Sequence, residues 1–347
     1  QNSFIHAVRL ADGFSAVIEV TWGIGTFLLY FIGISVLGVD AVPIGTFTAF
    51  AMYLTMFWDP IQNLAGFYNK LITNLSAAER IFEILDTPAE VADKPGVTEL
   101  PPIKGEVTFD HVSFAYSDDP DTLVLKDVSF TAAPGETIAL VGPTGAGKTT
   151  IVNLISRFIT SGTVRVDGHS LTDVSINSLR AQMGVMTQDN FLFSGTIRDN
   201  IAYGKLDATE EEIIAAAKAV HAHDFIIELP DGYDTEISER GARLSNGQRQ
   251  LLAFARTMVS DPRILILDEA TSSIDTQTEI QVQQGIESLL KGRTSFIIAH
   301  RLSTIKNADR IFVIDHGKIF EQGTHDELMA KQGAYYQLYQ AQFRRVS

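Results

Sequence analysis

The sequence of 347 residues lacks cysteine entirely and is poor in basic residues. Without cysteine it can form neither a disulfide framework nor a thiolate zinc site. Its 27 lysines and arginines are outnumbered by 42 aspartates and glutamates, which gives a formal net charge of −15. Proteins that bind nucleic acids or adsorb to anionic membrane surfaces need clustered basic residues. The composition therefore argues against both classes, and we expect no nucleic-acid partner.

Charge of either sign is scarce in one part of the chain. Residues 1–85 contain nine charged residues, whereas residues 103–347 contain 55. The total length also exceeds that of an average domain. We therefore expect two different kinds of domain, 1–85 and 103–347. Residues 86–102 between them contain four prolines, which favours an extended linker.

The charge-poor region contains two uncharged stretches, residues 20–39 and 41–58. Twenty helical residues span about 30 Å, the thickness of the hydrocarbon core of a bilayer. We expect a hairpin of two membrane helices at about 14–38 and 43–68, and a helical continuation at 76–86. A buried hairpin of a large soluble domain fits this pattern less well, and so does a cleaved signal peptide.

Basic residues flank the outer ends of the hairpin, since Arg9 precedes it and Lys70 and Arg80 follow it, while its turn contains none. Because basic residues favour the cytoplasmic side, both outer ends are predicted to be cytoplasmic. The expected location is thus the cell membrane (inner or plasma membrane), with several spans through the lipid bilayer and a cytoplasmic second domain. Two helices make a poor membrane domain alone, so we also expect further membrane helices before residue 1.

Residues 103–347 alternate strand and helix patterns, which is typical of an α/β fold with a largely parallel sheet. Short apolar runs at residues 136–142 and 263–268 suit buried strands. Residues 208–220 are predicted to be a helix that begins with a capping box, because Glu212 stands three positions after Thr209.

A glycine-rich segment, GPTGAGKT, occupies residues 142–149, after the predicted strand and before a helical pattern at 150–158. It fits the phosphate-loop pattern in the required strand–loop–helix context. Glycines let backbone N–H groups surround phosphates, Lys148 reaches the β- and γ-phosphates, and Thr149 supplies a hydroxyl to Mg²⁺. The predicted ATP-binding residues here are Gly142, Pro143, Thr144, Gly145, Ala146, Gly147, Lys148, Thr149 and Thr150.

Two carboxylates, Asp268 and Glu269, follow the second buried strand. Asp268 is predicted to hold Mg²⁺ directly or through water, and Glu269 to polarise the attacking water. Together with the phosphate loop, this pair predicts hydrolysis of a nucleoside triphosphate, with ATP and Mg²⁺ as the cofactors.

Residues 244–248 read LSNGQ, and the segments Ser-Ile-Asp and Ala-His-Arg follow, ending at Asp275 and centred on His300. With the phosphate loop and the acidic pair, this ordered set closely resembles the nucleotide-binding domain of the ATP-binding cassette (ABC) family. The preceding hairpin makes the chain similar to a bacterial multidrug or lipid half-transporter, from its last two membrane helices onward. The resemblance implies an α/β phosphate-loop ATPase with a helical subdomain, which drives export of a drug, lipid or peptide-like substrate.

The resemblance also assigns roles to individual residues. Tyr116 is expected to stack on adenine, and Gln188 to contact Mg²⁺ and face the coupling helices of the membrane domain. Asp275 is expected at a dimer interface, and His300 is expected to hold the γ-phosphate. Residues 235–241 resemble the loop that senses the partner's coupling helices. The signature residues, which close over the γ-phosphate of the opposite subunit, are Leu244, Ser245, Asn246, Gly247 and Gln248.

The resemblance implies a second half-transporter packed head to tail, with two ATP molecules between the subunits. Asn246 replaces the first glycine of the usual LSGGQ signature. Altered signatures often occur in heterodimers with one weakened ATP site, so a heterodimer is slightly favoured over a homodimer. Two alternatives stay open: an ATP-gated channel or regulatory subunit of the same fold, and a soluble ABC ATPase.

Overall fold

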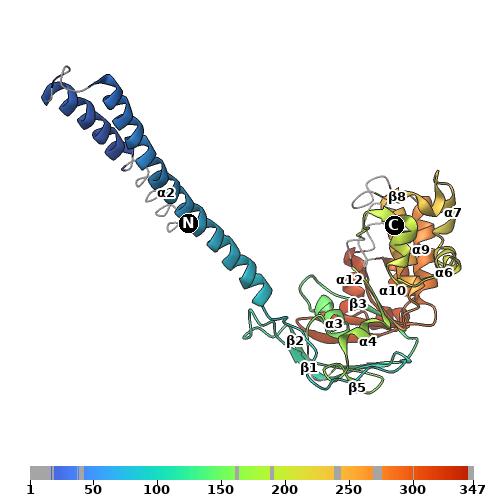
Figure 1. Cartoon of the computed structure of the whole chain (residues 1–347). Coiled ribbons are helices and arrows are strands. Elements are labelled where there is room, and N and C mark those ends of the chain that lie inside the picture. The colour runs from blue at the N-terminus through green and yellow to red at the C-terminus, as the bar shows by residue number, and fades with distance from the viewer. Residues whose placement is uncertain are drawn as a thin grey trace. The chain divides into compact units, whose positions relative to one another are not determined.

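The computed structural model describes residues 17, 19–36, 38, 43–160, 164–187, 191–237, 244–268, 276–299 and 301–342. The chain forms two compact units, Gln1–Ala89 and Glu90–Ser347 (Figure 1). Most of the expected linker at 86–102 therefore lies within the second unit. The expected domain limits at residues 85 and 103 stay predictions.

The first unit is a pair of helices. Residues 19–31 are α-helical and continue into the π-helix η1 (Ile32–Val36). The second helix, α2, runs from Ile44 to Asp86. A Cβ atom at Gly33 would collide with the ring of Phe47, so glycine at this position allows the two helices to approach closely.

One helix among the described residues, Glu19–Val36, is long and apolar enough to cross a membrane. The expected start of this span, at residue 14, lies outside the described residues. Helix α2 has 43 residues, or about 65 Å at the usual rise per residue. It contains both the expected second span and the expected continuation at 76–86 in a single helix. Passage of α2 through a membrane stays a prediction.

The second unit contains two main β-sheets. The larger has the order β12-β11-β3-β10-β9-β6, in which β12 is antiparallel and the other strands are parallel. The smaller is antiparallel, with the order β2-β1-β4-β5. The strands of the larger sheet are β3 (Thr137–Val141), β6 (Met183–Met186), β9 (Ile264–Asp268), β10 (Thr294–Ile298), β11 (Arg310–Asp315) and β12 (Lys318–Gly323). The remaining strands are β1 (Val107–Phe114), β2 (Leu125–Ala132), β4 (Val164–Val166), β5 (His169–Ser170) and the short pair β7 (Gly195–Thr196) and β8 (Glu236–Ile237).

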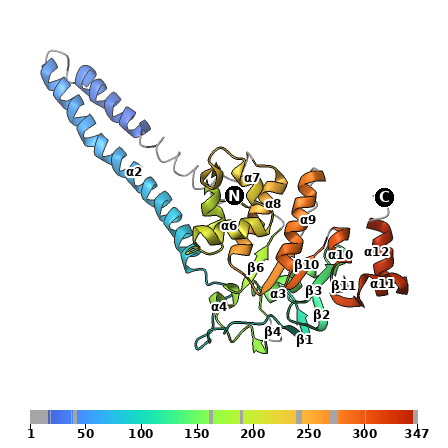
Figure 2. The same cartoon turned by 90° about the vertical axis from the view of Figure 1, so that its right-hand side faces the viewer.

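Helices cover the larger sheet in separate groups, and Figure 2 shows α6, α7 and α8 lying away from α11 and α12. The first group is made of α5 (Ile197–Ala202), α6 (Glu210–Ala219), α7 (His223–Ile227), the 3-10 helix η2 (Gly232–Asp234), α8 (Asn246–Val259) and α9 (Thr276–Leu290). The others are α3 (Lys148–Ile155), α4 (Ile176–Arg180), α10 (Leu302–Lys306), α11 (His325–Lys331) and α12 (Ala334–Gln342).

A buried aromatic cluster joins the two sheets beneath α3. Phe130 of the smaller sheet packs against Phe109 at a centroid distance of 4.5 Å and against Phe312 of the larger sheet at 5.1 Å. Ile151 and Leu154 of α3 are buried in the same cluster. This packing fixes α3 above the strands that carry the predicted site.

The structure confirms the predicted fold class, helices followed by an α/β phosphate-loop domain. The two apolar runs form β3 and β9, and every residue of β3 is buried. The predicted capping box of α6 is present in both directions between Thr209 and Glu212. Helix α3 begins at Lys148, earlier than the pattern at 150–158 predicted. It also ends earlier, at Ile155, because Arg157 adopts a positive φ of 54° that does not continue a helix.

Candidate nucleotide-binding site

The loop between β3 and α3 contains three glycines with positive φ. Gly142, Gly145 and Gly147 have φ values of 150°, 80° and 107°, which other residues rarely adopt. A Cβ atom at Gly142 would collide with the carbonyl oxygen of Ile314, and one at Gly147 would lie 2.8 Å from Cδ2 of Leu125. The path of this loop therefore depends on glycine for both its conformation and its space.

The Lys148 ammonium group lies over this loop. Its Nζ donates hydrogen bonds to the carbonyl oxygens of Gly142 at 2.8 Å and Pro143 at 2.9 Å. Burial lowers the pKa of Lys148, and the negative charge of Asp268 partly opposes this effect. A cation beside a glycine loop and the first turn of a helix is an arrangement that attracts phosphate.

Asp268 reaches the same place from another strand. It ends β9, whose neighbour β10 pairs Ile298 with Asp268 on one side and with Leu140 of β3 on the other. The carboxyl ends of these parallel strands therefore meet at one edge of the sheet. The predicted Mg²⁺ ligands Asp268 and Thr149 both belong to this edge, and the Thr149 side chain is exposed. A carboxylate and a hydroxyl are oxygen donors of the kind that Mg²⁺ prefers.

Tyr116 lies beside the helix that follows the loop. Its hydroxyl is 3.2 Å from Oγ1 of Thr150, a buried residue of α3. The ring packs edge-on against Phe114 at 5.1 Å. Tyr116 also lines a pocket of about 370 Å³ together with Asp118, Asp119, Thr122 and Val124. The sequence predicts only Tyr116 as a site residue, because no motif marks the other four residues.

The structure thus gathers one group of predicted residues into a single site. Its members are Tyr116, Asp268 and the continuous loop residues Gly142, Pro143, Thr144, Gly145, Ala146, Gly147, Lys148, Thr149 and Thr150.

The signature segment forms the start of a different helix, α8, which Figure 2 shows apart from α3. Ser245 is its N-cap: its hydroxyl accepts from the Gln248 amide at 3.2 Å, and Oε1 of Gln248 accepts from the Ser245 amide at 2.9 Å. The Asn246 side chain is exposed, and its Oδ1 accepts a hydrogen bond from Arg249 of the same helix. Within one chain, the signature residues do not join the phosphate loop.

Four predicted residues, Gln188, Glu269, Asp275 and His300, lie outside the described residues. Residues 238–241 of the predicted partner-sensing loop also lie outside them. The positions and roles of these residues stay predictions.

Comparison with known proteins gives consistent matches. The sequence profile of the ABC transporter family matches residues 125–272. The chain is 49% identical over 344 residues to an uncharacterized ABC transporter ATP-binding protein, YknV, of Bacillus subtilis, and covers 57% of it. It is 46% identical over 333 residues to an ATP-dependent lipid A-core flippase of Syntrophus aciditrophicus, and covers 55% of it. These matches include 99% and 95% of this chain, so it spans little more than half the length of these relatives.

A solved structure supports the same assignment. The structure of a bacterial Atm1-family ABC exporter with ATP bound matches 97% of this chain and 58% of its own chain, with a TM-score of 0.72 and 38% identity. The match includes the helices of the first unit as well as the α/β unit. The chain therefore belongs to the ABC exporters of the ATP-binding and permease type, of which it matches the C-terminal portion, including the ABC transporter ATPase domain.

Proposed function

We propose that this chain binds Mg²⁺–ATP in the loop at 142–150 and hydrolyses it to drive export through a membrane. The observation that carries the proposal is the position of the Lys148 ammonium group, held over a glycine loop and near the carboxylate of Asp268. An ammonium group there neutralises the charge of the β- and γ-phosphates. Tyr116 closes the other side of the site, where its ring supplies an aromatic face for adenine.

In this proposal Mg²⁺ would be held by Thr149, Asp268 and Gln188, and it would neutralise charge that develops on the transferred phosphoryl group. Glu269 orients and polarises the attacking water, and His300 donates a hydrogen bond that positions the γ-phosphate. Lys148 binds the phosphates throughout the reaction, because its donors can turn from the two loop carbonyls to phosphate oxygens.

The second half of each ATP site comes from another subunit. Ser245 and Asn246 are exposed at the start of α8, a helix of 14 residues whose N-terminal dipole attracts phosphate. Two subunits packed head to tail would bring this helix start to the partner's loop, with Asp275 at the interface. We favour a heterodimer slightly over a homodimer, because the Asn246 side chain occupies a position where the usual signature has glycine.

The membrane part of the proposal concerns residues 1–85. Two spans, at about 14–38 and 43–68, cross the plasma membrane, residues 86–102 connect them to the ATPase domain at 103–347, and that domain is cytoplasmic. Apolar side chains exposed along both helices, such as Phe27 and Phe57, suit contact with lipid or with other membrane helices. The proposed cargo is a drug, lipid or peptide-like molecule; one relative is named as an ATP-dependent lipid A-core flippase.

A Glu269→Gln variant tests the proposal for hydrolysis. We expect it to bind ATP with unchanged affinity but to hydrolyse it about 100-fold more slowly or worse, because glutamine cannot polarise water as a carboxylate does. Phosphate release and ATP binding are measured on the same preparations. The matched control is Glu287→Gln, which makes the same chemical change at an exposed position of α9. Full turnover by Glu269→Gln would refute the assigned role.

A further inference from the structure

Arg157 is the largest fully buried side chain among the described residues. It stands immediately beyond Ser156, the C-cap of α3, and its side chain is 2% exposed. A buried guanidinium group is strongly destabilising unless charged and polar partners surround it. The partners of Arg157 therefore indicate which segments this residue holds together.

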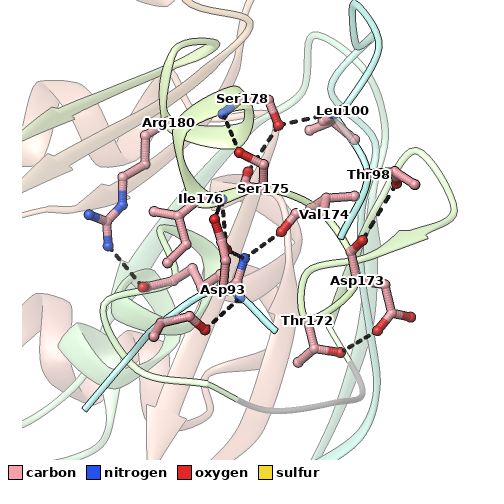
Figure 3. Close-up of polar contacts among 12 residues, drawn as sticks. Asp93, Thr98, Leu100, Thr172, Asp173, Val174, Ser175, Ile176, Ser178 and Arg180 are labelled. Carbon is pink, nitrogen blue, oxygen red and sulfur yellow. Dashed lines mark hydrogen bonds and ion pairs between the residues drawn. The ribbon is translucent and has the colours of Figure 1, made fainter. Parts of the chain in front are cut away.

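Among the described residues Arg157 donates to three acceptors, and two of them lie in the expected linker at 86–102. Its NH1 group donates to Oδ1 of Asp93 at 3.0 Å and to the Val174 carbonyl at 2.5 Å. Its NH2 group donates to the Ala92 carbonyl at 3.4 Å. Figure 3 shows Asp93 at the centre of this network.

Asp93 also contacts the start of helix α4. Its two carboxylate oxygens accept from the backbone amide of Ile176, the first residue of α4, at 3.1 and 3.2 Å. The Asp93 side chain is 33% exposed, so the ion pair is largely shielded on the arginine side only. One carboxylate therefore connects the segment before it to the ends of two helices, α3 and α4.

The rest of the segment is attached to the same region. Thr98 pairs with the chain around Val174: its amide donates to the Asp173 carbonyl at 3.1 Å, and its carbonyl accepts from the Ser175 amide at 2.8 Å. The Leu100 amide donates to Oγ of Ser178 at 2.9 Å (Figure 3). Residues 90–100 are therefore a docked strap rather than a free connection.

The attached segment connects helix α2 to the region around α3. Helix α2 ends at Asp86, seven residues before Asp93, so at most about 25 Å of extended chain separates them. Helix α3 begins at Lys148 and ends next to Arg157. A single ion pair therefore ties the chain that leaves α2 to the far end of the helix that begins with the phosphate-binding lysine.

We propose that Asp93 and Arg157 are positioning residues for the nucleotide cycle, which couple displacement of the phosphate-loop helix α3 to the chain leading into α2. This inference rests on the proposed function, because it concerns the regulation of the same ATP site. A contribution to stability alone explains the pair poorly, since buried ion pairs add little stability compared with apolar residues of the same size. What the pair does supply is a fixed connection between two segments distant in sequence.

The test uses Asp93→Asn, which removes the charge while it keeps the size of the side chain. Because the chain has no cysteine, Ile84→Cys introduces a single labelling site at a position of α2 that is 76% exposed. The chain is placed in phospholipid nanodiscs with an environment-sensitive fluorophore at residue 84. Mg²⁺–ATP is then titrated, and both the ATP dissociation constant and the change in fluorescence at saturation are recorded.

We expect the ATP dissociation constant of Asp93→Asn to stay within about twofold of that of the parent chain. Its fluorescence change at saturating ATP is expected to be about fivefold smaller, since coupling between sites typically amounts to about fivefold or more. The matched control is Asp261→Asn, which breaks another ion pair with a largely buried arginine, Arg293, at 2.8 Å. It is expected to keep the full fluorescence change. Asp93→Glu restores the charge and is expected to recover most of the signal.

Three outcomes overturn the inference: a full fluorescence change in Asp93→Asn, an equal loss in Asp261→Asn, or no change in the parent chain despite ATP binding. In each of them ATP still binds, so the proposed function survives. A parent chain that binds no ATP overturns both. If Asp93→Asn fails to fold, Thr98→Pro replaces it, because proline removes the 3.1 Å amide bond to Asp173 while the side chains of Asp93 and Arg157 are both retained. It is expected to reduce the signal, and an unchanged signal counts against the inference.

Discussion

The two units of the chain differ in how fully their own residues bury their apolar side chains. In the second unit Phe296 and Phe312 are completely buried. In the first unit Phe57 is 66% exposed and Phe27 64% exposed, although both lie within regular helices. The α/β unit therefore contains its own hydrophobic core. The described helices of the first unit leave most of their apolar side chains exposed, to be covered by lipid or by other helices. The difference indicates where the stability of each unit comes from.

The strongest test of this comparison truncates one phenylalanine in each unit. Phe296→Ala is expected to lower the free energy of unfolding of the second unit by about 4 kcal/mol, because it leaves a cavity between the two sheets. Phe57→Ala is expected to cost under about 0.5 kcal/mol in detergent, because its ring contributes little buried area within the chain.

Urea unfolding of the chain in detergent measures both effects. Both tryptophans, Trp22 and Trp58, belong to the first unit, so their fluorescence reports on the helical pair, while hydrogen exchange at the β10 amides reports on the sheet. Equal destabilisation by the two substitutions would show that the helices also contain a packed core of their own.

How much the sequence could predict depends on whether a feature is formed by residues close together in the chain. Strands β3 and β9, the phosphate loop and the capping box of α6 were predictable, because each depends on residues that are neighbours in sequence. The Asp93–Arg157 ion pair was not, because 64 positions separate the two residues and nothing local marks Arg157 as buried.

The pocket beside Tyr116 was missed for a related reason. Asp118 and Asp119 belong to an irregular segment after β1 with no periodicity to interpret, and only the fold brings Val124 beside Gly147. By contrast, the catalytic roles of Glu269 and His300 depend on a family resemblance and stay predictions. Sequence patterns thus identified the loop, and tertiary packing decided what surrounds it.

A second test measures how strongly nucleotide stabilises the α/β unit. Mg²⁺–ATP at about 100 times its dissociation constant is expected to stabilise the second unit by about 2.7 kcal/mol, since a ligand that binds only the folded state favours it by mass action. Lys148→Ala should remove most of this gain, because it deletes the cation held over the loop. Hydrogen exchange in β3 and β10, with and without ATP, measures the gain.

Lys331→Ala is the control for the lysine substitution, because Lys331 is an exposed residue of α11, outside the loop. It should retain the full stabilisation by ATP. An equal loss in both variants would mean that general charge, rather than the loop, attracts the nucleotide.

The smallest expected effect concerns how helices begin in the two units. Helix α6 starts with Thr209, whose hydroxyl accepts from the Glu212 amide at 3.3 Å, whereas α2 starts after Pro43 with no side-chain cap. Thr209→Ala is expected to destabilise the second unit by about 1 kcal/mol, the usual loss for an N-cap. Thr48→Ala in α2 removes only a hydroxyl bonded to the Ile44 carbonyl of its own helix, at 3.1 Å, and should change stability by less than about 0.5 kcal/mol.

Urea unfolding followed by hydrogen exchange in α6, and by tryptophan fluorescence for α2, separates the two effects. A larger loss for Thr48→Ala would mean that the helical pair, like the α/β unit, depends on specific local contacts for its stability.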